Sequence, residues 1–469
     1  MVFSSLTFCF FILPLFLFFN YLSKNTSYRN IVLILVSILF YTWGEDSKLT
    51  VLICYGVINY AFGYFLELFK AKSKSTAFIF LTVFVTCNLL GLIYYKYTYW
   101  LFSFITFLDI DFVTFFKNPT LPIGISFFTF HAISYLIDIY RGELSGKNKV
   151  SNFLTYFFMF PHLVAGPIVR YKDIEPQLNY RENDLTLFNY GLYRFILGIN
   201  KKLLIANSVA PIADTAFSTS LDLSLCDSWL GALAYTIQIY FDFSAYSDMA
   251  IGLAAMAGIK FKENFNSPYK SKSVKEFWRR WHISLSSWLR DYVYIPIGGS
   301  RVGVKRTYLN LCLVFLLCGI WHGASLTFVL WGLYHGLFLI LERVFGSKID
   351  VSKVPYIIKH GYCLLAVIIG WVIFRAENLD QAFSYIGRMF TFESFDKSFA
   401  LNYPCYSFNV IALVVGSFIS LFSLKAFSSN SCEEKNVRLI PYILNAAFLV
   451  LSLAVLYLGA KNPFIYFNF

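Results

Sequence analysis

The chain consists of long apolar stretches separated by short polar segments. A helix needs about 20 consecutive, mostly apolar residues to cross the hydrocarbon core of a bilayer. Stretches that reach or approach this length lie near residues 3–23, 30–44, 48–69, 76–95, 119–140, 187–206, 228–256, 307–322, 325–345, 355–375, 406–424 and 440–460. The pattern predicts an all-α fold, a polytopic transmembrane helical bundle with about 11–13 hydrophobic segments.

Three segments need separate interpretation. Residues 1–22 lack a basic start and a small-residue cleavage site, so we expect a retained first helix rather than a signal peptide. Residues 97–112 are aromatic and short, which predicts an interfacial segment. Residues 152–169 contain Pro161 and Pro167, which interrupt a helix, so we expect a re-entrant or kinked element there.

Composition supports a membrane protein. Hydrophobic residues make up 58% of the 469 positions and charged residues only 14%, whereas soluble domains contain roughly 25% charged residues. The chain has 53 Phe and 33 Tyr, residue types that suit the interfaces of a bilayer. We find no internal repeat and no appended soluble segment, which predicts a single membrane domain over residues 1–469. The nine Cys are scattered without a Cys-x-x-Cys pair, so we expect no metal site and no disulfide framework.

Positive charge is concentrated in one segment. Residues 260–306 contain eleven Lys or Arg and three acidic residues, a net charge of +8 out of +12 for the chain. Basic loops stay in the cytoplasm, and the other basic loops fall on the same side of the predicted helices, so we expect both termini outside. The opposite loop, residues 206–232, has three Asp and no Lys or Arg. A basic surface also attracts anionic lipid headgroups or a phosphorylated donor; we expect no nucleic acid partner.

Residues 277–292 have the spacing of an amphipathic helix. Its apolar positions recur every three or four residues, as in a helix with one buried face; they are Phe277, Trp278, Trp281, Leu285, Trp288, Leu289 and Tyr292. Arg279 and Arg290 fall on the other face. About 16 residues with this charge cannot span a bilayer, so the helix is expected at the cytoplasmic interface. His282 lines up with the apolar face and should point toward the protein.

The six histidines differ in their candidacy for chemistry. His322 is the strongest candidate, because it lies at the end of an apolar run. An imidazole is costly to place at membrane depth, so its presence there indicates a functional residue. The alternative to a catalytic role is that His322 makes a structural hydrogen bond to a carbonyl of a neighbouring helix. His335 is better explained by helix packing and His360 by an interfacial position. His131 and His162 lie in polar-interrupted apolar segments that could line a cavity.

Two carboxylates within the apolar segment 228–256 require partners. Asp242 and Asp248 would be costly to bury alone. They could pair with Arg279, Arg280 or Arg290, or one of them could orient a catalytic histidine.

Several common chemistries lack their motifs. The chain has no Gly-x-Ser-x-Gly elbow, no His-Glu-x-x-His metal pair and no Walker phosphate loop. A serine hydrolase, a zinc hydrolase and an ATP-driven pump are therefore disfavoured.

Several stretches together resemble the membrane-bound O-acyltransferase family, particularly its bacterial alginate O-acetylation branch. They cover residues 121–131, 160–170, 238–250, 263–269, 276–286, 288–292, 295–299 and 321–323. Two Trp-His pairs, Trp281-His282 and Trp321-His322, stand out among them. The resemblance extends over nearly the whole chain.

The resemblance implies acyl transfer, with His322 as the catalytic histidine and His282 as a second active-site histidine. The attacking hydroxyl would give its proton to His322, and His282 or backbone N–H groups would stabilise the tetrahedral intermediate. Arg279, Arg280 and Arg290 lie where a phosphate-rich donor would approach, because arginine binds phosphate by charge and by paired hydrogen bonds.

The resemblance also implies substrates and partners. The donor would be acetyl-CoA or an acyl carrier thioester on the cytoplasmic side, used as a substrate rather than bound permanently. The acceptor would be an extracytoplasmic polysaccharide: alginate, another exopolysaccharide or peptidoglycan. Membrane lipid surrounds the protein, and a separate periplasmic esterase-like transferase would complete the transfer. The expected location is the bacterial inner membrane.

Two other functions are compatible with the helix pattern. One is a transporter or flippase for a polysaccharide or a lipid-linked sugar. Many transporters contain an internal repeat, which this chain lacks, and the two Trp-His pairs favour the acyltransferase. The other is a non-catalytic scaffold for a polysaccharide synthase.

Overall fold

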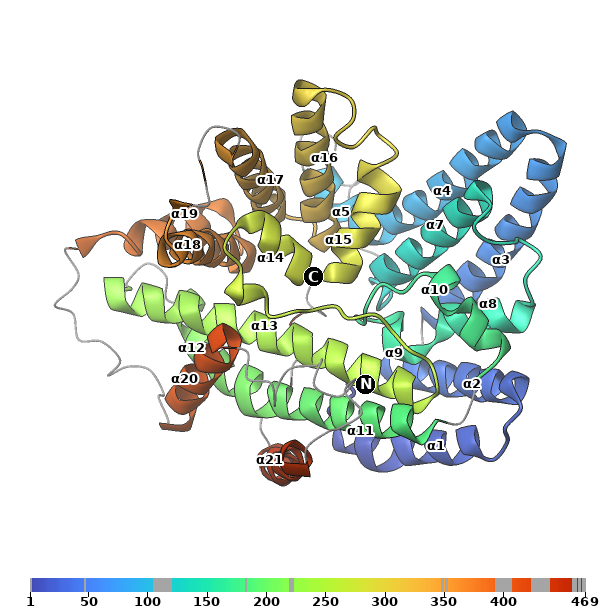
Figure 1. The fold of residues 1–469 in the computed structure, drawn as a ribbon, viewed down its shortest axis with the longest axis horizontal. Coiled ribbons are helices and arrows are strands. Elements are labelled where there is room, and N and C mark those ends of the chain that lie inside the picture. Colours follow the sequence, from blue (N-terminus) through green and yellow to red (C-terminus); the bar gives the residue numbers. More distant parts are fainter. Residues whose placement is uncertain are drawn as a thin grey trace. The chain divides into compact units, whose positions relative to one another are not determined.

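Every regular element that the structure describes is a helix (Figure 1). The computed structural model describes residues 2–45, 48–103, 120–181, 184–218, 223–346, 350, 353–392, 407–422, 439–457, 462 and 465. The predicted all-α fold is confirmed over these residues. Most of the predicted interfacial segment 97–112, the acidic residue Asp222 and the ends of the last two predicted spans lie outside them.

The elements follow the predicted apolar stretches closely, and additional short helices lie between them. In chain order they are η1 (Phe8–Ile12), α1 (Leu13–Tyr21), α2 (Thr26–Glu45), α3 (Leu49–Lys72), α4 (Lys74–Lys96), α5 (Thr98–Ser103), α7 (Ile125–Arg141), α8 (Val150–Phe158), α9 (Phe160–Leu163), α10 (Tyr171–Asn179), α11 (Leu185–Asn200), η3 (Lys201–Ala206), α12 (Asn207–Ser218), α13 (Leu225–Met256), η5 (Pro268–Lys270), α14 (Val274–Arg280), α15 (Ile283–Leu289), η6 (Arg290–Tyr294), α16 (Val304–His322), α17 (Leu326–Gly346), α18 (Tyr356–Arg375), α19 (Leu379–Arg388), α20 (Ser407–Phe422) and α21 (Leu439–Tyr457).

Seven helices in the described part of the chain are long and apolar enough to cross a bilayer. They are Thr26–Glu45, Leu49–Lys72, Lys74–Lys96, Leu185–Ser218, Val304–His322, Leu326–Gly346 and Tyr356–Arg375. Shorter apolar helices cover Phe8–Tyr21, Ser407–Phe422 and Pro441–Tyr457. This architecture confirms a polytopic helical membrane protein.

Internal packing sorts the chain into two compact units. Unit 1 contains Met1–Phe195 with Met249–Lys262, and unit 2 contains Ile196–Asp248 with Glu263–Phe469. The boundaries fall within α11 and α13, so each of these helices contributes residues to both units. The single domain expected over residues 1–469 stays a prediction.

Unit 1 is built around three helices that pack on one another, α3, α4 and α7. Asn59 and Asn88 exchange side-chain hydrogen bonds of 2.9 and 2.8 Å between α3 and α4, which satisfies two amides inside apolar helices. The prediction of a kinked element over residues 152–169 agrees with the break at Met159 between α8 and α9, where Pro161 lies in the first turn of α9.

Unit 2 contains a closely packed helix pair, α16 and α17 (Figure 1). A Cβ on Gly319 would collide with the Phe328 carbonyl oxygen, and one on Gly332 with the Phe315 carbonyl oxygen. Both glycines are therefore needed for the backbones to approach this closely. Helix α14 contacts α17 and α18, and η6 of the same basic segment contacts α16. This arrangement brings the basic segment against the helices that carry His322 and His335.

Two buried ion pairs connect η3 to α13. Lys202 Nζ lies 2.5 Å from Asp242 Oδ1, and Lys201 Nζ lies 2.6 Å from Asp248 Oδ2. The arginine partners predicted for these carboxylates were therefore wrong. The lysines lie inside a predicted apolar span, where sequence reasoning looked for no countercharge.

We expect Lys202→Met to destabilise the protein strongly, because Asp242 would be left as an uncompensated buried charge. Removing one partner of a buried pair costs roughly 3–5 kcal/mol. Abundance in the membrane and thermal unfolding in detergent would measure the loss. The control is Lys262→Met, which removes a lysine that is 77% exposed and paired with Asp173; exposed pairs contribute at most about 1 kcal/mol. Equal stability of the two variants would contradict a stabilising role for the buried pair.

Candidate active site

The predicted single helix over residues 277–292 is wrong. Helix α14 ends at Arg280, and α15 begins at Ile283. Between them Trp281 is extended, and His282 has φ 43° and ψ 55°, in the left-handed region. Few non-glycine residues adopt this conformation, and where they do it often belongs to a functional site.

Hydrogen bonds to a neighbouring segment compensate for the helix break. The backbone N–H of Asn266 donates to the Arg280 carbonyl at 2.9 Å, and the N–H of Ile283 donates to the Asn264 carbonyl at 2.9 Å. Backbone groups in apolar surroundings need such partners. The two hydrogen bonds explain why helical spacing did not produce a continuous helix here.

His282 is fully buried beside Asn264 and the ring of Phe243. Its Nδ1 lies 3.3 Å from Asn264 Oδ1, and its Nε2 has no hydrogen-bond partner among the described residues. The ring centroids of His282 and Phe243 are 4.7 Å apart. Burial lowers the pKa of His282 to about 3, so this imidazole is neutral at neutral pH. The expected inward orientation of His282 is correct, although the break and not helical spacing produces it.

His322 ends α16 and is 4% exposed. Its ring meets Trp331 at 5.0 Å and Phe374 at 5.1 Å between centroids, both edge to face. The ring of Trp321 lies 4.9 Å from His322 and 6.1 Å from His282. The structure thus places the two histidines of the Trp-His pairs around one indole ring, although they are forty positions apart in the chain.

Gly323 allows the chain to leave α16 beside His322. A Cβ at this position would collide with the Phe328 ring. The glycine therefore makes room for an aromatic ring of α17, which in turn stacks 6.5 Å from the His322 ring.

His335 belongs to the same aromatic surroundings. It is 1% exposed and lies 5.1 Å from Trp331 and 5.4 Å from Trp278 between ring centroids. Its Nδ1 has no hydrogen-bond partner in the described residues. The packing role expected for His335 agrees with these contacts.

The remaining histidines lie elsewhere. His131 and His162 stack in unit 1 with ring centroids 4.4 Å apart, and His162 Nε2 lies 2.6 Å from the Tyr156 carbonyl oxygen. His360 Nδ1 lies 3.1 Å from the Ser271 carbonyl oxygen.

The three arginines that are candidates for donor binding differ in their exposure and in their ion pairs. Arg279 is exposed. Arg280 pairs with Glu276 of the same helix at 2.9 Å, and Arg290 pairs with the adjacent Asp291 at 2.6 Å while its side chain stays 61% exposed. Arg279 is thus open to a ligand, whereas Arg290 is exposed but donates two hydrogen bonds to the Asp291 carboxylate.

The start of α14 is held in place from α17. The Glu342 carboxylate accepts hydrogen bonds from the backbone N–H groups of Val274 at 2.5 Å and Lys275 at 3.0 Å. A carboxylate at a helix N-terminus satisfies free N–H groups and complements the helix dipole. This contact fixes the helix that carries Arg279 and Arg280.

Sequence reasoning missed two features of the site. Asn264 contacts His282 from 18 positions earlier in the chain, and no local pattern pairs the two residues. Phe374 of α18 reaches His322 only through the fold. Across the described residues no group of three or more His, Cys, Asp or Glu side chains could hold a metal ion.

Comparison with known proteins gives one family match and several similar proteins, and their descriptions agree with one another. The sequence model of the membrane-bound O-acyltransferase family matches residues 140–379. A probable alginate O-acetylase AlgI of Azotobacter vinelandii is 46% identical over 84% of this chain and 78% of its own length, and that of Pseudomonas putida is 39% identical over 100% of both. A peptidoglycan O-acetyltransferase of Helicobacter pylori is 32% identical over 95% of this chain and 93% of its own. The chain therefore belongs to the membrane-bound O-acyltransferase family and is a multi-pass membrane acyltransferase.

Proposed function

We propose that this acyltransferase moves acetyl groups from a cytoplasmic thioester donor across the bacterial inner membrane for O-acetylation of a polysaccharide. The observation that carries the proposal is the convergence of His282 and His322 around Trp321. Family membership favours this function over the sugar transporter that the helix pattern also allows. The relatives named alginate O-acetylase are more similar to this chain than the peptidoglycan O-acetyltransferase is, which favours an exopolysaccharide such as alginate over peptidoglycan.

The proposed step is direct acyl transfer. A hydroxyl oxygen attacks the thioester carbonyl carbon, the C=O electron pair moves to oxygen, and His322 takes the hydroxyl proton. The intermediate then collapses: the C=O bond re-forms, the C–S bond breaks, and the proton held by His322 passes to the departing thiolate. Backbone N–H groups are candidates to stabilise the oxyanion. Aromatic side chains around His322 keep water out of this step.

The basic segment is the proposed donor site. Arg279 and Arg290 are exposed guanidinium groups that can bind the phosphates of acetyl-CoA or of an acyl carrier, and Arg280 adds positive charge. The Lys and Arg distribution supports a cytoplasmic location for this segment.

Transfer to a polymer outside the membrane implies a second protein. We propose a periplasmic esterase-like transferase that receives the acetyl group on its own hydroxyl in the step above and then places it on the polysaccharide.

We expect His322→Ala to abolish O-acetylation, because the variant removes the proposed base. The protein should still reach the membrane in normal amount, because the substitution changes only a small part of the core. Acetyl ester content of purified polymer would measure the effect. The matched control is His335→Ala, which removes an equally buried imidazole from the same aromatic surroundings and should retain activity per molecule. Wild-type acetylation by the His322 variant would remove the catalytic assignment.

We expect Arg290→Ala to raise the KM for the acetyl donor by more than it lowers kcat. Its pair with Asp291 is exposed and contributes little to stability, so the fold should persist. Arg301→Ala, at an exposed position of the same basic segment, is the control. Steady-state kinetics on reconstituted protein would compare them. An unchanged KM for Arg290→Ala would place the donor site elsewhere.

A further inference from the structure

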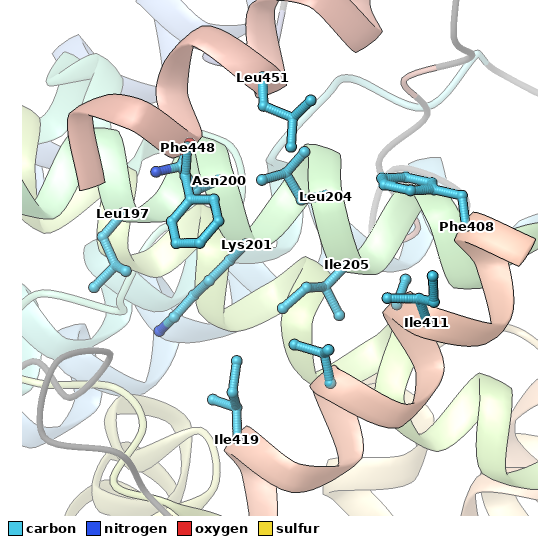
Figure 2. A pocket seen from close by; sticks show the side chains of 12 residues that line it. Leu197, Asn200, Lys201, Leu204, Ile205, Phe408, Ile411, Ile419, Phe448 and Leu451 are labelled. Atoms are coloured by element: carbon cyan, nitrogen blue, oxygen red, sulfur yellow. The ribbon is translucent and has the colours of Figure 1, made fainter. Parts of the chain in front are cut away.

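An apolar hollow opens in unit 2 between η3, α20 and α21 (Figure 2). Its volume is about 220 Å³, larger than the roughly 150 Å³ apolar cavity that suffices to hold a benzene molecule. The lining residues are Leu197, Asn200, Lys201, Leu204, Ile205, Phe408, Ile411, Ala412, Val415, Ile419, Phe448 and Leu451.

The two polar lining residues direct their polar atoms to other protein groups. Lys201 Nζ pairs with Asp248. Asn200 Nδ2 donates to Asn445 Oδ1 at 2.7 Å, and Asn200 Oδ1 accepts from Ser452 Oγ at 2.8 Å. The hollow therefore offers an occupant aliphatic and aromatic surface, which suits a hydrocarbon and not a sugar or a nucleotide.

The floor and the rim of the hollow differ in exposure. The floor is buried and includes Leu197, Ile205 and Ala412. The rim consists of apolar side chains that are 37–57% exposed, namely Phe408, Ile411, Val415, Phe448 and Leu451. In a multi-pass membrane protein, exposed apolar side chains on apolar helices face lipid. The hollow is thus continuous with a lipid-facing surface.

We propose that this hollow binds one acyl chain of a membrane phospholipid. The acyl chain inserts between α20 and α21 and contacts the floor formed by α11, η3 and α20. The acyl chain fills the hollow and makes dispersion contacts with its walls. Lipid thereby completes the packing of α20 and α21 against η3.

The test uses the full chain reconstituted in phosphatidylethanolamine vesicles that contain a phospholipid with a photoreactive diazirine in its acyl chain. After illumination, mass spectrometry locates the lipid adducts. We expect adducts concentrated on rim residues of α20 and α21. Val415→Trp, which blocks the rim, should lower the α21 adducts several-fold.

Val414→Trp is the matched control, because Val414 is 62% exposed on the same helix but does not line the hollow. It should leave the α21 adducts unchanged. Ala412→Phe, which fills the hollow from its floor, should also lower them. Adducts spread evenly along the exposed helix faces and insensitive to Val415→Trp would overturn the proposal.

A separate observation concerns Asn264, which is fully buried beside His282. Its Oδ1 accepts hydrogen bonds from the backbone N–H of Ser284 at 3.1 Å and from Ser284 Oγ at 2.8 Å. Its Nδ2 donates to Ser247 Oγ at 3.0 Å. Because a backbone N–H can only donate, these contacts fix which end of the amide is oxygen.

The orientation of Asn264 determines the tautomer of His282. A carbonyl oxygen only accepts, so the contact between Asn264 Oδ1 and His282 Nδ1 requires the proton on Nδ1. A neutral imidazole then carries its lone pair on Nε2. That atom is buried and has no partner among the described residues. His282 is consequently an acceptor toward a substrate, and the oxyanion-stabilising donor role expected for it from the sequence does not fit this tautomer.

We infer that Asn264 is a positioning residue that holds His282 with Nε2 ready to accept a hydrogen bond from the bound substrate. This inference rests on the proposed function, in which His282 belongs to the active site. The groups packed against the ring are Phe243 of α13, Trp321 of α16, Ser284 of α15 and Asn264 itself. None of these side chains titrates between pH 4 and 9. The proposed base His322 also contributes to the pH profile of kcat, so a shift of an Asn264 variant's profile relative to that of the wild type is the quantity that reports on His282.

Two substitutions distinguish positioning from structural support. Asn264→Leu removes the acceptor and should lower kcat at every pH with little change in KM. Asn264→Asp keeps an acceptor and should restore part of kcat. Its carboxylate also favours protonated His282, so activity should be lost at a higher pH than in the wild type as the pH falls. Asn266→Leu is the control, because the side chain of Asn266 is exposed.

The outcomes separate this inference from the proposed function. If His282→Ala is inactive while Asn264→Leu has wild-type kcat and pH profile, the positioning role is wrong and the active site stands. If His282→Ala is fully active, the proposed role of His282 fails first. Equal loss of abundance in both Asn264 variants, with unchanged activity per molecule and pH profile, would make Asn264 purely structural.

Discussion

Two backbone hydrogen bonds stabilise the helix break at Trp281 and His282, and the geometry of the candidate site depends on them. They join Arg280 to Asn266 and Ile283 to Asn264 at 2.9 Å each. In apolar surroundings a broken helix is tolerated only where its free backbone groups find other partners. The segment before α14 supplies those partners and also places the Asn264 side chain against His282. The same few residues thus satisfy the backbone groups at the helix break and orient the ring of His282, which belongs to the candidate active site.

Aromatic side chains provide the low-dielectric surroundings of this site. Trp321 separates the two histidines, and Trp331 and Phe374 pack edge to face against His322. Such contacts contribute about 0.5–1.5 kcal/mol each beyond area burial. They also withhold water from the imidazoles, which keeps His282 neutral. A neutral imidazole can accept a proton or a hydrogen bond, as acyl transfer requires.

The charges of the protein divide according to burial. The buried carboxylates Asp242 and Asp248 have lysine partners from η3, because an unpaired charge would be costly there. The arginines of the basic segment remain at least partly exposed, where they can bind an anionic donor without a large desolvation penalty. Lys201 pairs with Asp248 through its ammonium group, and its aliphatic stem lines the apolar hollow. Long side chains can serve both roles, since the aliphatic stem and the charged end occupy different environments.

The sequence alone determined the class of the protein and most of its helices. Apolar length sets the spans, as in the predicted segments 307–322 and 355–375, which became α16 and α18. The Trp-His motifs were recognisable because they are local in sequence. The tertiary structure decided the helix break at His282, the lysine partners of the carboxylates and the contact of Asn264 with His282. Each of these depends on residues distant in the chain, whose hydrogen bonds and charges outweigh the local periodicity that a sequence displays.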